Sequence, residues 1–284
     1  MRSAAISPFL KPGACDGGKP NNVNCRHFWI SIAALAFLAF LLSQDSLARV
    51  AWQKYRSSAV ALALDRDDAA LAMNIGNYSF GGGAYNLAVA ERAYRRAVAI
   101  DPKILWGHYQ LARIIFVKGD FAGALAEINR ELEANPENLR SLYVRGLIYG
   151  YMENAAKAAE DFRRFTEWVP TEWAGYNDLA WALSKGGRHQ EALAAITTAL
   201  DKVPGGETNP WLWNAKGVAE LNIADYNAAT ASFAKAKSAT DQLTLDAWRK
   251  AYPGNDPASA VAGLDAFRSA IRENLRRAES HLKR

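Results

Sequence analysis

Small and apolar positions along this chain recur at one long interval of 34 residues. Four prolines mark that interval: Pro102, Pro136, Pro170 and Pro204. Eight residues before each proline stands a large apolar side chain, in order Tyr94, Ile128, Phe162 and Ile196. Twelve residues before each proline stands a small one, in order Ala90, Ala124, Ala158 and Ala192. Matching residues at a fixed interval predict one structural unit that is copied several times.

The unit is predicted to be a pair of antiparallel helices. Small residues recur where two helices must approach closely, twenty-four positions before a proline, at Ala112, Gly146 and Ala180. Residue pairs suited to tight turns fall between the two helices: Gly119-Asp120, Gly186-Gly187 and Ala224-Asp225. Each proline then starts the connection to the next unit, because proline cannot continue a helix.

A fifth copy lacks the closing proline but keeps the other positions. It carries Gly217, Ala229, Phe233 and Ala236, displaced by three residues because residues 205–209 lengthen the preceding loop. Asp241 takes the place of the proline and can cap a helix start. The register of the repeat therefore continues to about residue 240.

These positions resemble the tetratricopeptide repeat family, whose pattern is tryptophan or a substitute, then Leu-Gly, Tyr, Ala, Phe, Ala and Pro. Residues 176–183 with 191–193, and residues 213–217 with 229–236, match that pattern best. Four units start near residues 105, 139, 173 and 210, and a degenerate unit containing Gly81-Gly82-Gly83 precedes them. The resemblance implies an all-α fold, a right-handed α-solenoid of helix hairpins.

Composition agrees with a helical solenoid, since half of the residues are hydrophobic and β-branched runs are absent. A solenoid grows by adding units and needs no second core. The expected organisation is an N-terminal tail (1–27), a hydrophobic anchor or signal segment (28–43), a linker helix (44–66), the degenerate repeat (67–102), four repeats (103–240) and C-terminal capping helices (241–284).

Residues 28–42 form an apolar run that only Ser31 interrupts. A helix of that length spans about 22 Å, less than the roughly 30 Å hydrocarbon core of a bilayer, so flanking side chains would have to reach the interface. We predict an uncleaved membrane anchor. A cleaved secretory signal is the main alternative, because Ser46-Leu47-Ala48 follows the run, and a buried globular helix is the third interpretation.

Basic residues flank the apolar run on both sides and nearly balance, so charge alone leaves the orientation open. We expect a cytoplasmic N-terminus with the repeats outside the cytoplasm. Secretion after cleavage and a cytoplasm-facing array are the alternatives. Cys15 and Cys25 both precede the run, which excludes a disulfide framework or a cysteine metal site in the repeats.

The sequence offers little that suggests chemistry. The four histidines, His27, His108, His189 and His281, are scattered without metal-ligand spacing. His108 takes a position that the family fills with a large packing residue, so a partly buried structural histidine is expected. Nucleophile, phosphate-binding and dinucleotide motifs are absent. We expect no catalytic residue, no metal and no cofactor, and therefore no enzyme.

The net charge of +5 adds little to this picture. Basic side chains outnumber acidic ones in the last 17 residues, which a solvated helix end explains. Aromatic residues do not alternate with basic ones there, so nucleic-acid binding is not expected.

The resemblance also implies a concave face lined by the first helix of each unit. In the family, the second, fifth and ninth residues of a unit tend to face this groove. Here these are Trp106, Tyr109 and Arg113; Arg140, Tyr143 and Leu147; Ala174, Asn177 and Trp181; and Trp211, Asn214 and Val218. The nine aromatic, amide and guanidinium members suit a peptide, whose backbone and carboxylates they could bind. Packing between units is the alternative for each ring, and it is the expected role of Trp173 and Trp213.

After the last unit, an apolar stripe runs along a final helix: Val261, Leu264, Phe267, Ile271, Leu275, Ala278 and Leu282. We expect it to close the solenoid by packing on the last unit. Self-association or binding of a second protein is the alternative.

The sequence therefore predicts a membrane-tethered scaffold that binds a peptide or protein segment in its groove. Some family members clamp a chaperone's C-terminal carboxylate with lysines and asparagines, and the groove positions here do not reproduce that clamp. The alternative function is that of a structural subunit of a cell-envelope assembly, or of a secretion or polysaccharide complex, which uses the convex face and the terminal helix.

Overall fold

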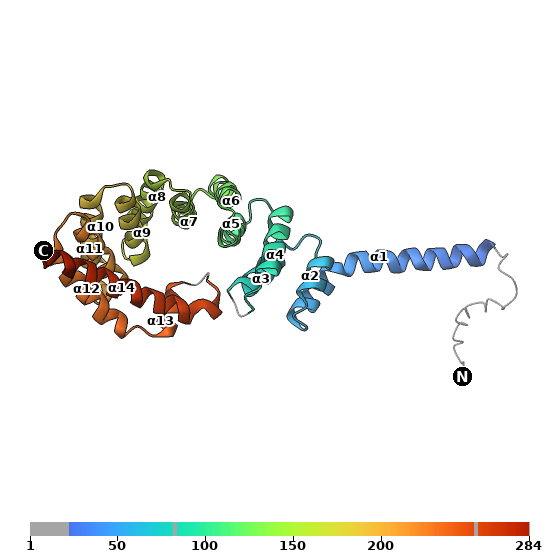
Figure 1. Ribbon diagram of the computed structural model, residues 1–284. Helices are drawn as coiled ribbons and strands as arrows, with labels where there is room; N and C mark the ends of the chain where they lie inside the picture. Colours follow the sequence, from blue (N-terminus) through green and yellow to red (C-terminus); the bar gives the residue numbers. More distant parts are fainter. Residues whose placement is uncertain (1–22, 82–83, 253–254, 284) are drawn as a thin grey trace, which may run out of the picture.

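The computed structural model describes residues 23–81, 84–252 and 255–283, and the regular structure of these residues is helical. Ten of the helices form five antiparallel hairpins that stack into an arch (Figure 1). The pairs are α3 (Ala69–Phe80) with α4 (Leu87–Ile100), α5 (Gly107–Val117) with α6 (Phe121–Ala134), α7 (Arg140–Tyr151) with α8 (Ala155–Trp168), α9 (Trp173–Lys185) with α10 (His189–Lys202), and α11 (Pro210–Asn222) with α12 (Tyr226–Asp241). In Figure 1, α5, α7 and α9 lie on the inner side of the arch. The predicted all-α solenoid of helix hairpins is confirmed.

The turns inside the hairpins explain part of the 34-residue interval. One residue in each of the last four turns has a left-handed backbone: Gly119 (φ 84°), Glu153 (φ 59°), Gly187 (φ 73°) and Ala224 (φ 64°). The following residue is the N-cap of the second helix, and in three turns its side chain accepts a hydrogen bond from the backbone N–H three residues later: Asp120, Asn154 and Asp225. Glycine adopts this conformation without steric cost, whereas other residues lose roughly 1–2 kcal/mol. The stacked hairpins therefore keep the turn even where the sequence has no glycine.

Inside each hairpin, a small residue on the first helix faces a large residue on the second, and their sizes are matched. A Cβ atom added to Gly146 would lie 2.7 Å from the ring of Phe162, and one added to Gly217 would lie 2.6 Å from the ring of Phe233. The remaining hairpins carry Gly76 with Tyr94, Ala112 with Ile128, and Ala180 with Ile196. Glycine therefore accompanies a ring and alanine accompanies isoleucine, which fills the interface without voids.

Glu131 stands five residues before Pro136, where two other units have Ala97 and Ala199, and the structure gives the reason for this departure. Its carboxylate is fully buried and accepts hydrogen bonds from the backbone N–H groups of Trp106 (3.0 Å) and Tyr109 (3.1 Å). The side chains of Asn135 (3.2 Å) and Asn138 (2.8 Å) also donate to it. The first N–H groups of a helix lack internal partners, so Glu131 of α6 caps the start of α5.

The N-terminal helix α1 (Val23–Gln53) continues through the apolar run and into the first part of the expected linker (44–66), because no glycine or proline interrupts it. A short break then separates it from α2 (Ser58–Leu64). Near the end of α1, Ala48, Ala51 and Trp52 pack in one cluster with residues of α2, α3 and α4. The side chains of residues 29–40 are exposed, and α1 projects away from the arch (Figure 1). Residues 1–22 of the predicted tail lie outside the described residues.

Within the described part of the chain, no single helix is both long and apolar enough to cross a membrane. Two segments of α1, Trp29–Phe40 and Ser43–Gln53, reach that length and composition only when taken together, across a bend of 50°. The structure therefore lends the predicted anchor little support, and anchoring stays a hypothesis.

The C-terminal segment packs on the last hairpin and crosses the open side of the arch (Figure 1). Helix α14 (Ala260–Leu282) packs along α12 and buries Leu264, Ile271 and Ala278 of the predicted stripe, which confirms its capping role. The ends of the stripe, at Val261 and Leu282, stay exposed. Helix α13 (Leu245–Ala251) and the short helix η2 (Pro257–Ser259) precede α14, and residues of this region line a cavity together with Gly81 at the end of α3. The segment thus reaches from the last hairpin to the first.

The size match inside the hairpins predicts coupling between Gly146 and Phe162. Gly146→Ala alone should lower the free energy of unfolding by about 1–3 kcal/mol, because the new methyl group overlaps the ring. Phe162→Ile alone should also destabilise, because it leaves a cavity. The double variant recreates the alanine–isoleucine pair of the neighbouring hairpins, so its loss should be smaller than the sum of the single losses. Chemical unfolding of all four proteins measures this, and additive losses would contradict the match.

Candidate peptide-binding groove

The inner side of the arch holds two adjoining cavities, of about 700 Å³ and about 320 Å³. The larger cavity is lined mainly by α7, α9 and α11, and the smaller cavity mainly by α5, α7 and the end of α13. Tyr143, Leu147 and Tyr252 line both, so the two cavities form one groove. The first helices of the hairpins supply most of its walls.

Eight of the nine predicted site residues line this groove. Tyr109, Arg113 and Arg140 line the smaller cavity, Asn177, Trp181, Trp211 and Asn214 line the larger one, and Tyr143 lines both. Trp106 lines neither: it lies at the turn before α5 with a φ of 72°, and its ring packs edge-on against Tyr109 with 5.0 Å between centroids. Peptide binding by these residues stays a prediction.

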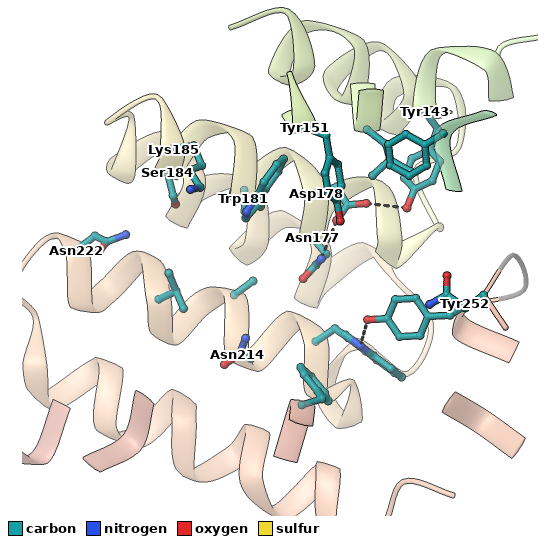
Figure 2. A pocket seen from close by; sticks show the side chains of 18 residues that line it. Tyr143, Tyr151, Asn177, Asp178, Trp181, Ser184, Lys185, Asn214, Asn222 and Tyr252 are labelled. Carbon is teal, nitrogen blue, oxygen red and sulfur yellow. Dashed lines mark hydrogen bonds between the residues drawn. The ribbon is translucent and has the colours of Figure 1, made fainter. Parts of the chain in front are cut away.

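The larger cavity has a carboxylate in its wall, that of Asp178 on α9 (Figure 2). Tyr143 Oη donates a hydrogen bond to Asp178 Oδ2 (2.6 Å), and Asn177 Nδ2 donates one to Oδ1 (2.9 Å). Burial raises the pKa of Asp178 to about 6, although both hydrogen bonds act in the opposite direction. Among the described residues, no cationic side chain shifts this pKa. Asp178 is thus a half-buried carboxylate in the cavity wall, and both of its hydrogen-bond donors are neutral.

Two exposed rings line the same cavity as Asp178 (Figure 2). Trp181 is 38% exposed, and its ring covers Gly150 of α7, where an added Cβ would lie only 2.3 Å from the ring. Tyr151 at the end of α7 is 59% exposed and packs edge-on against Phe116, with 5.0 Å between centroids. Because Gly150 has no side chain, Trp181 can approach α7 closely, and both rings border the cavity that holds Asp178.

The C-terminal segment forms one wall of the groove and covers Trp211. Trp211 Nε1 donates a hydrogen bond to Tyr252 Oη (2.8 Å; Figure 2), and the Trp211 ring stacks on Trp173 (4.6 Å between centroids) and Phe267 (5.6 Å). Only 7% of Trp211 stays exposed. Packing, the alternative role considered for each ring, therefore describes most of the Trp211 side chain, and peptide binding by Trp211 stays a prediction. Trp173 packs here, as predicted.

Asn214 and Trp213, which are close to Trp211 in the sequence, also make contacts that the repeat spacing does not indicate. Asn214 Oδ1 accepts a hydrogen bond from Asn274 Nδ2 of α14 (3.2 Å), which ties the groove to the C-terminal helix. Trp213 was expected to pack between units. Its ring instead lies below Lys235 Nζ (4.1 Å to the centroid), and its Nε1 donates to the carbonyl oxygen of Glu207 (2.8 Å).

Charge is distributed unevenly along the groove. Arg113, Arg140 and Lys250 line the smaller cavity, where Glu172 is the acidic residue. The Arg113 guanidinium lies over the ring of Phe80, 4.7 Å from its centroid. The smaller cavity is therefore predominantly basic, whereas the larger cavity combines Asp178 with Lys185 of the same helix.

The ionisable groups outside the groove serve structural roles. His108 is buried, and its Nδ1 lies 2.7 Å from Glu127 Oε2 of the same hairpin, as expected for a structural histidine. Arg145 on α7 donates two hydrogen bonds to Asp161 on α8, of 2.7 and 2.8 Å. In the described ranges, no group of three or more His, Cys, Asp or Glu side chains could hold a metal ion.

Some groove residues were missed at the level of the sequence. Tyr151, Lys185 and Asn222 each stand four positions after a groove position, so a further turn of the same helical stripe would have included them. Asp178 adjoins a predicted position and carried no signal of its own. Tyr252 comes from the segment that folds back across the arch, which no repeat spacing indicates.

Comparison with known proteins agrees with this geometry. The tetratricopeptide repeat family's profile matches residues 139–171, which contain α7 and α8. The solved structures that resemble the chain include a MamA fragment from Desulfovibrio magneticus RS-1 (18% identity, TM-score 0.56, covering 63% of this chain and 99% of that one). They also include YrrB, a TPR protein described as having an unusual peptide-binding site (19% identity, TM-score 0.54, covering 66% of this chain and 93% of that one). These likenesses show the fold.

A sequence relative is the cellulose synthase operon protein C of Pseudomonas fluorescens (strain SBW25), which is 30% identical over 116 residues. The match covers 40% of this chain and 8% of that longer protein. One repeat thus matches the tetratricopeptide repeat family, and the stacked hairpins share the fold of the solved structures of that kind.

The raised pKa of Asp178 predicts that its ionisation destabilises the fold. The folded state binds this proton more tightly than the unfolded chain does, so stability should fall as pH rises from about 4 through 6. Asp178→Asn keeps an oxygen for Tyr143 and removes the charge. The variant should be more stable than the wild type at pH 7.5 by roughly 1–3 kcal/mol, and the advantage should disappear near pH 4.5.

Chemical unfolding of both proteins at pH 4.5, 6.0 and 7.5 measures this difference. The effects of all other titrating groups are common to both proteins and cancel in the comparison. A stability difference that is the same at all three pH values would show that the Asp178 carboxylate is not desolvated.

Proposed function

We propose that this protein is a non-enzymatic scaffold that binds an extended segment of a partner protein along the inner side of its arch. The observation that carries the proposal is the groove of two adjoining cavities, which combines exposed rings with amides and unpaired charges. Rings such as Trp181 offer apolar area, and the Asn177 amide can bind a peptide backbone. A groove of this size suits a few consecutive side chains of a segment.

The polarity of the groove supports a segment that carries charge. Arg113, Arg140 and Lys250 border the smaller cavity, and guanidinium groups bind carboxylates in a bidentate manner. Acidic side chains of the partner fit this end. Binding of such acidic side chains does not require the clamp of lysines and asparagines with which some family members hold a C-terminal carboxylate.

The scaffold is tethered to a membrane by the apolar part of α1, with the repeats outside the cytoplasm. Exposed apolar side chains on α1 support the membrane tether, including Ile30, Leu35 and Phe37, each more than 60% exposed. Such a surface is unfavourable in water and is buried when the helix enters a lipid or protein environment. The short apolar run makes tilting or local bilayer thinning part of the proposal.

The orientation can be tested with a reporter fused after residue 284. A reporter that works only in the cytoplasm should be inactive, and one that works only outside it should be active. The opposite result would place the arch in the cytoplasm.

A second candidate function is that of a subunit in an envelope assembly, with partners on the convex face. The 116-residue similarity to a cellulose synthase operon protein favours it. Such a subunit would keep its partners when the groove is altered.

Affinity purification of the full-length protein from solubilised membranes separates the two functions. The double variant Tyr109→Ala/Trp181→Ala removes one ring from each cavity, and Lys202→Ala on the exposed end of α10 serves as the control. We expect the groove variant to lose its co-purifying partner by at least tenfold, while the control retains it. Equal recovery with both variants would instead favour the convex face.

A further inference from the structure

Asp178 is a negative charge that the protein itself does not neutralise. Its two hydrogen bonds come from neutral groups, Tyr143 and Asn177, and among the described residues it makes no ion pair. Two buried carboxylates of the arch have a basic partner: Asp161 pairs with Arg145, and Glu220 pairs with Lys216. Buried Glu131 instead has four neutral donors that close it off, whereas Asp178 has two and borders an open cavity. A poorly hydrated charge beside a cavity is a place where a ligand can supply the partner.

The surroundings of Asp178 are open to such a ligand. The carboxylate borders a cavity of about 700 Å³, which is large enough for a long side chain. Trp181 lies one turn further along α9, and Tyr151 lies at the end of α7, and both exposed rings line the cavity that the carboxylate borders (Figure 2). Aromatic faces attract ammonium and guanidinium groups, and a desolvated site strengthens that attraction.

We propose that the larger cavity recognises a lysine or arginine side chain of the bound segment, with Asp178 as its counter-ion and Trp181 and Tyr151 as its aromatic walls. This inference rests on the proposed function of the groove. The apolar stem of the side chain lies against the rings, and its charged head reaches the carboxylate. Asn177 and Asn214, from the neighbouring helices α9 and α11, line the same cavity, and their remaining amide groups can bind the adjoining peptide backbone.

The two cavities together define the polarity of the ligand. The smaller cavity, with Arg113, Arg140 and Lys250, would repel a basic side chain, whereas Asp178 attracts one. Lys185 lines the larger cavity two turns beyond Asp178 on α9 and disfavours a second basic residue at that end. A partner segment is therefore expected to place one basic residue at the Asp178 position and acidic residues toward α5.

A random twelve-residue peptide library displayed on phage tests this on the full-length protein in detergent. Peptides selected on the wild type should carry Lys or Arg at one fixed position, and selection on Asp178→Asn should lose that enrichment. The Asn variant keeps the hydrogen bond from Tyr143, so the two proteins differ mainly in charge. Asp201→Asn, on the exposed end of α10, is the matched control and should select the same basic peptides as the wild type.

A double-mutant cycle then measures the interaction directly. Replacing the basic residue of a selected peptide by glutamine should weaken binding to the wild type at least tenfold, and binding to Asp178→Asn less than twofold. Basic peptides that bind both proteins equally would overturn the inference, and so would selected peptides without a basic residue.

The same selection separates this inference from the function on which it rests. Peptides without a basic residue that lose affinity for Tyr109→Ala would overturn the Asp178 site and leave the groove as the binding surface. Selected peptides that bind Tyr109→Ala and Trp181→Ala as tightly as the wild type would overturn both. If the library yields no binding peptide, that result would contradict both the Asp178 site and the groove as a binding surface.

Discussion

The arch depends on the match between a small residue and a large one inside each hairpin. The ring of Phe162 occupies the space where Gly146 has no side chain, and Ile196 takes the same place beside Ala180. Each pair determines how closely its two helices approach, so one matched contact per unit keeps the hairpins alike. Similar hairpins stack with a constant small rotation, and this rotation bends the array into a curve. The concave groove is therefore a consequence of packing that lies elsewhere in the unit.

The groove differs from the hairpin interfaces in its packing and in its charged groups. The interfaces are filled and their buried charges are paired, as in Arg145 with Asp161, whereas the larger cavity is open and holds the carboxylate of Asp178, which makes no ion pair among the described residues. The fold tolerates this unfavourable charge because the matched interfaces supply stability independently of the groove. The C-terminal segment adds a further wall, with Tyr252 bonded to Trp211, so the hollow of the arch is narrower than the repeats alone would make it.

Repeat spacing predicted the hairpins and the turns, and the family resemblance indicated most positions that line the groove, because each depends on contacts within one unit or between neighbours. Prediction from the sequence failed where contacts join distant segments. Trp211 stands at a groove position, yet Tyr252 and Phe267 cover it, and no local pattern indicates that fold-back. The hydrogen bond from Tyr143 to Asp178 could not be inferred from the sequence for a similar reason, since Tyr143 lies on α7 and Asp178 lies on α9. Glu131 breaks the repeat pattern because its carboxylate caps the start of α5, a contact that the repeat pattern does not indicate.

The central claim is that the inner side of the arch is the binding surface. Hydrogen–deuterium exchange of the full-length protein, with and without its bound partner segment, tests it most directly. The account predicts slower exchange on binding in α7, α9 and the residues around Tyr252, with little change in α8, α10 and α12. Protection concentrated in those outer helices, with the inner helices unchanged, would contradict it.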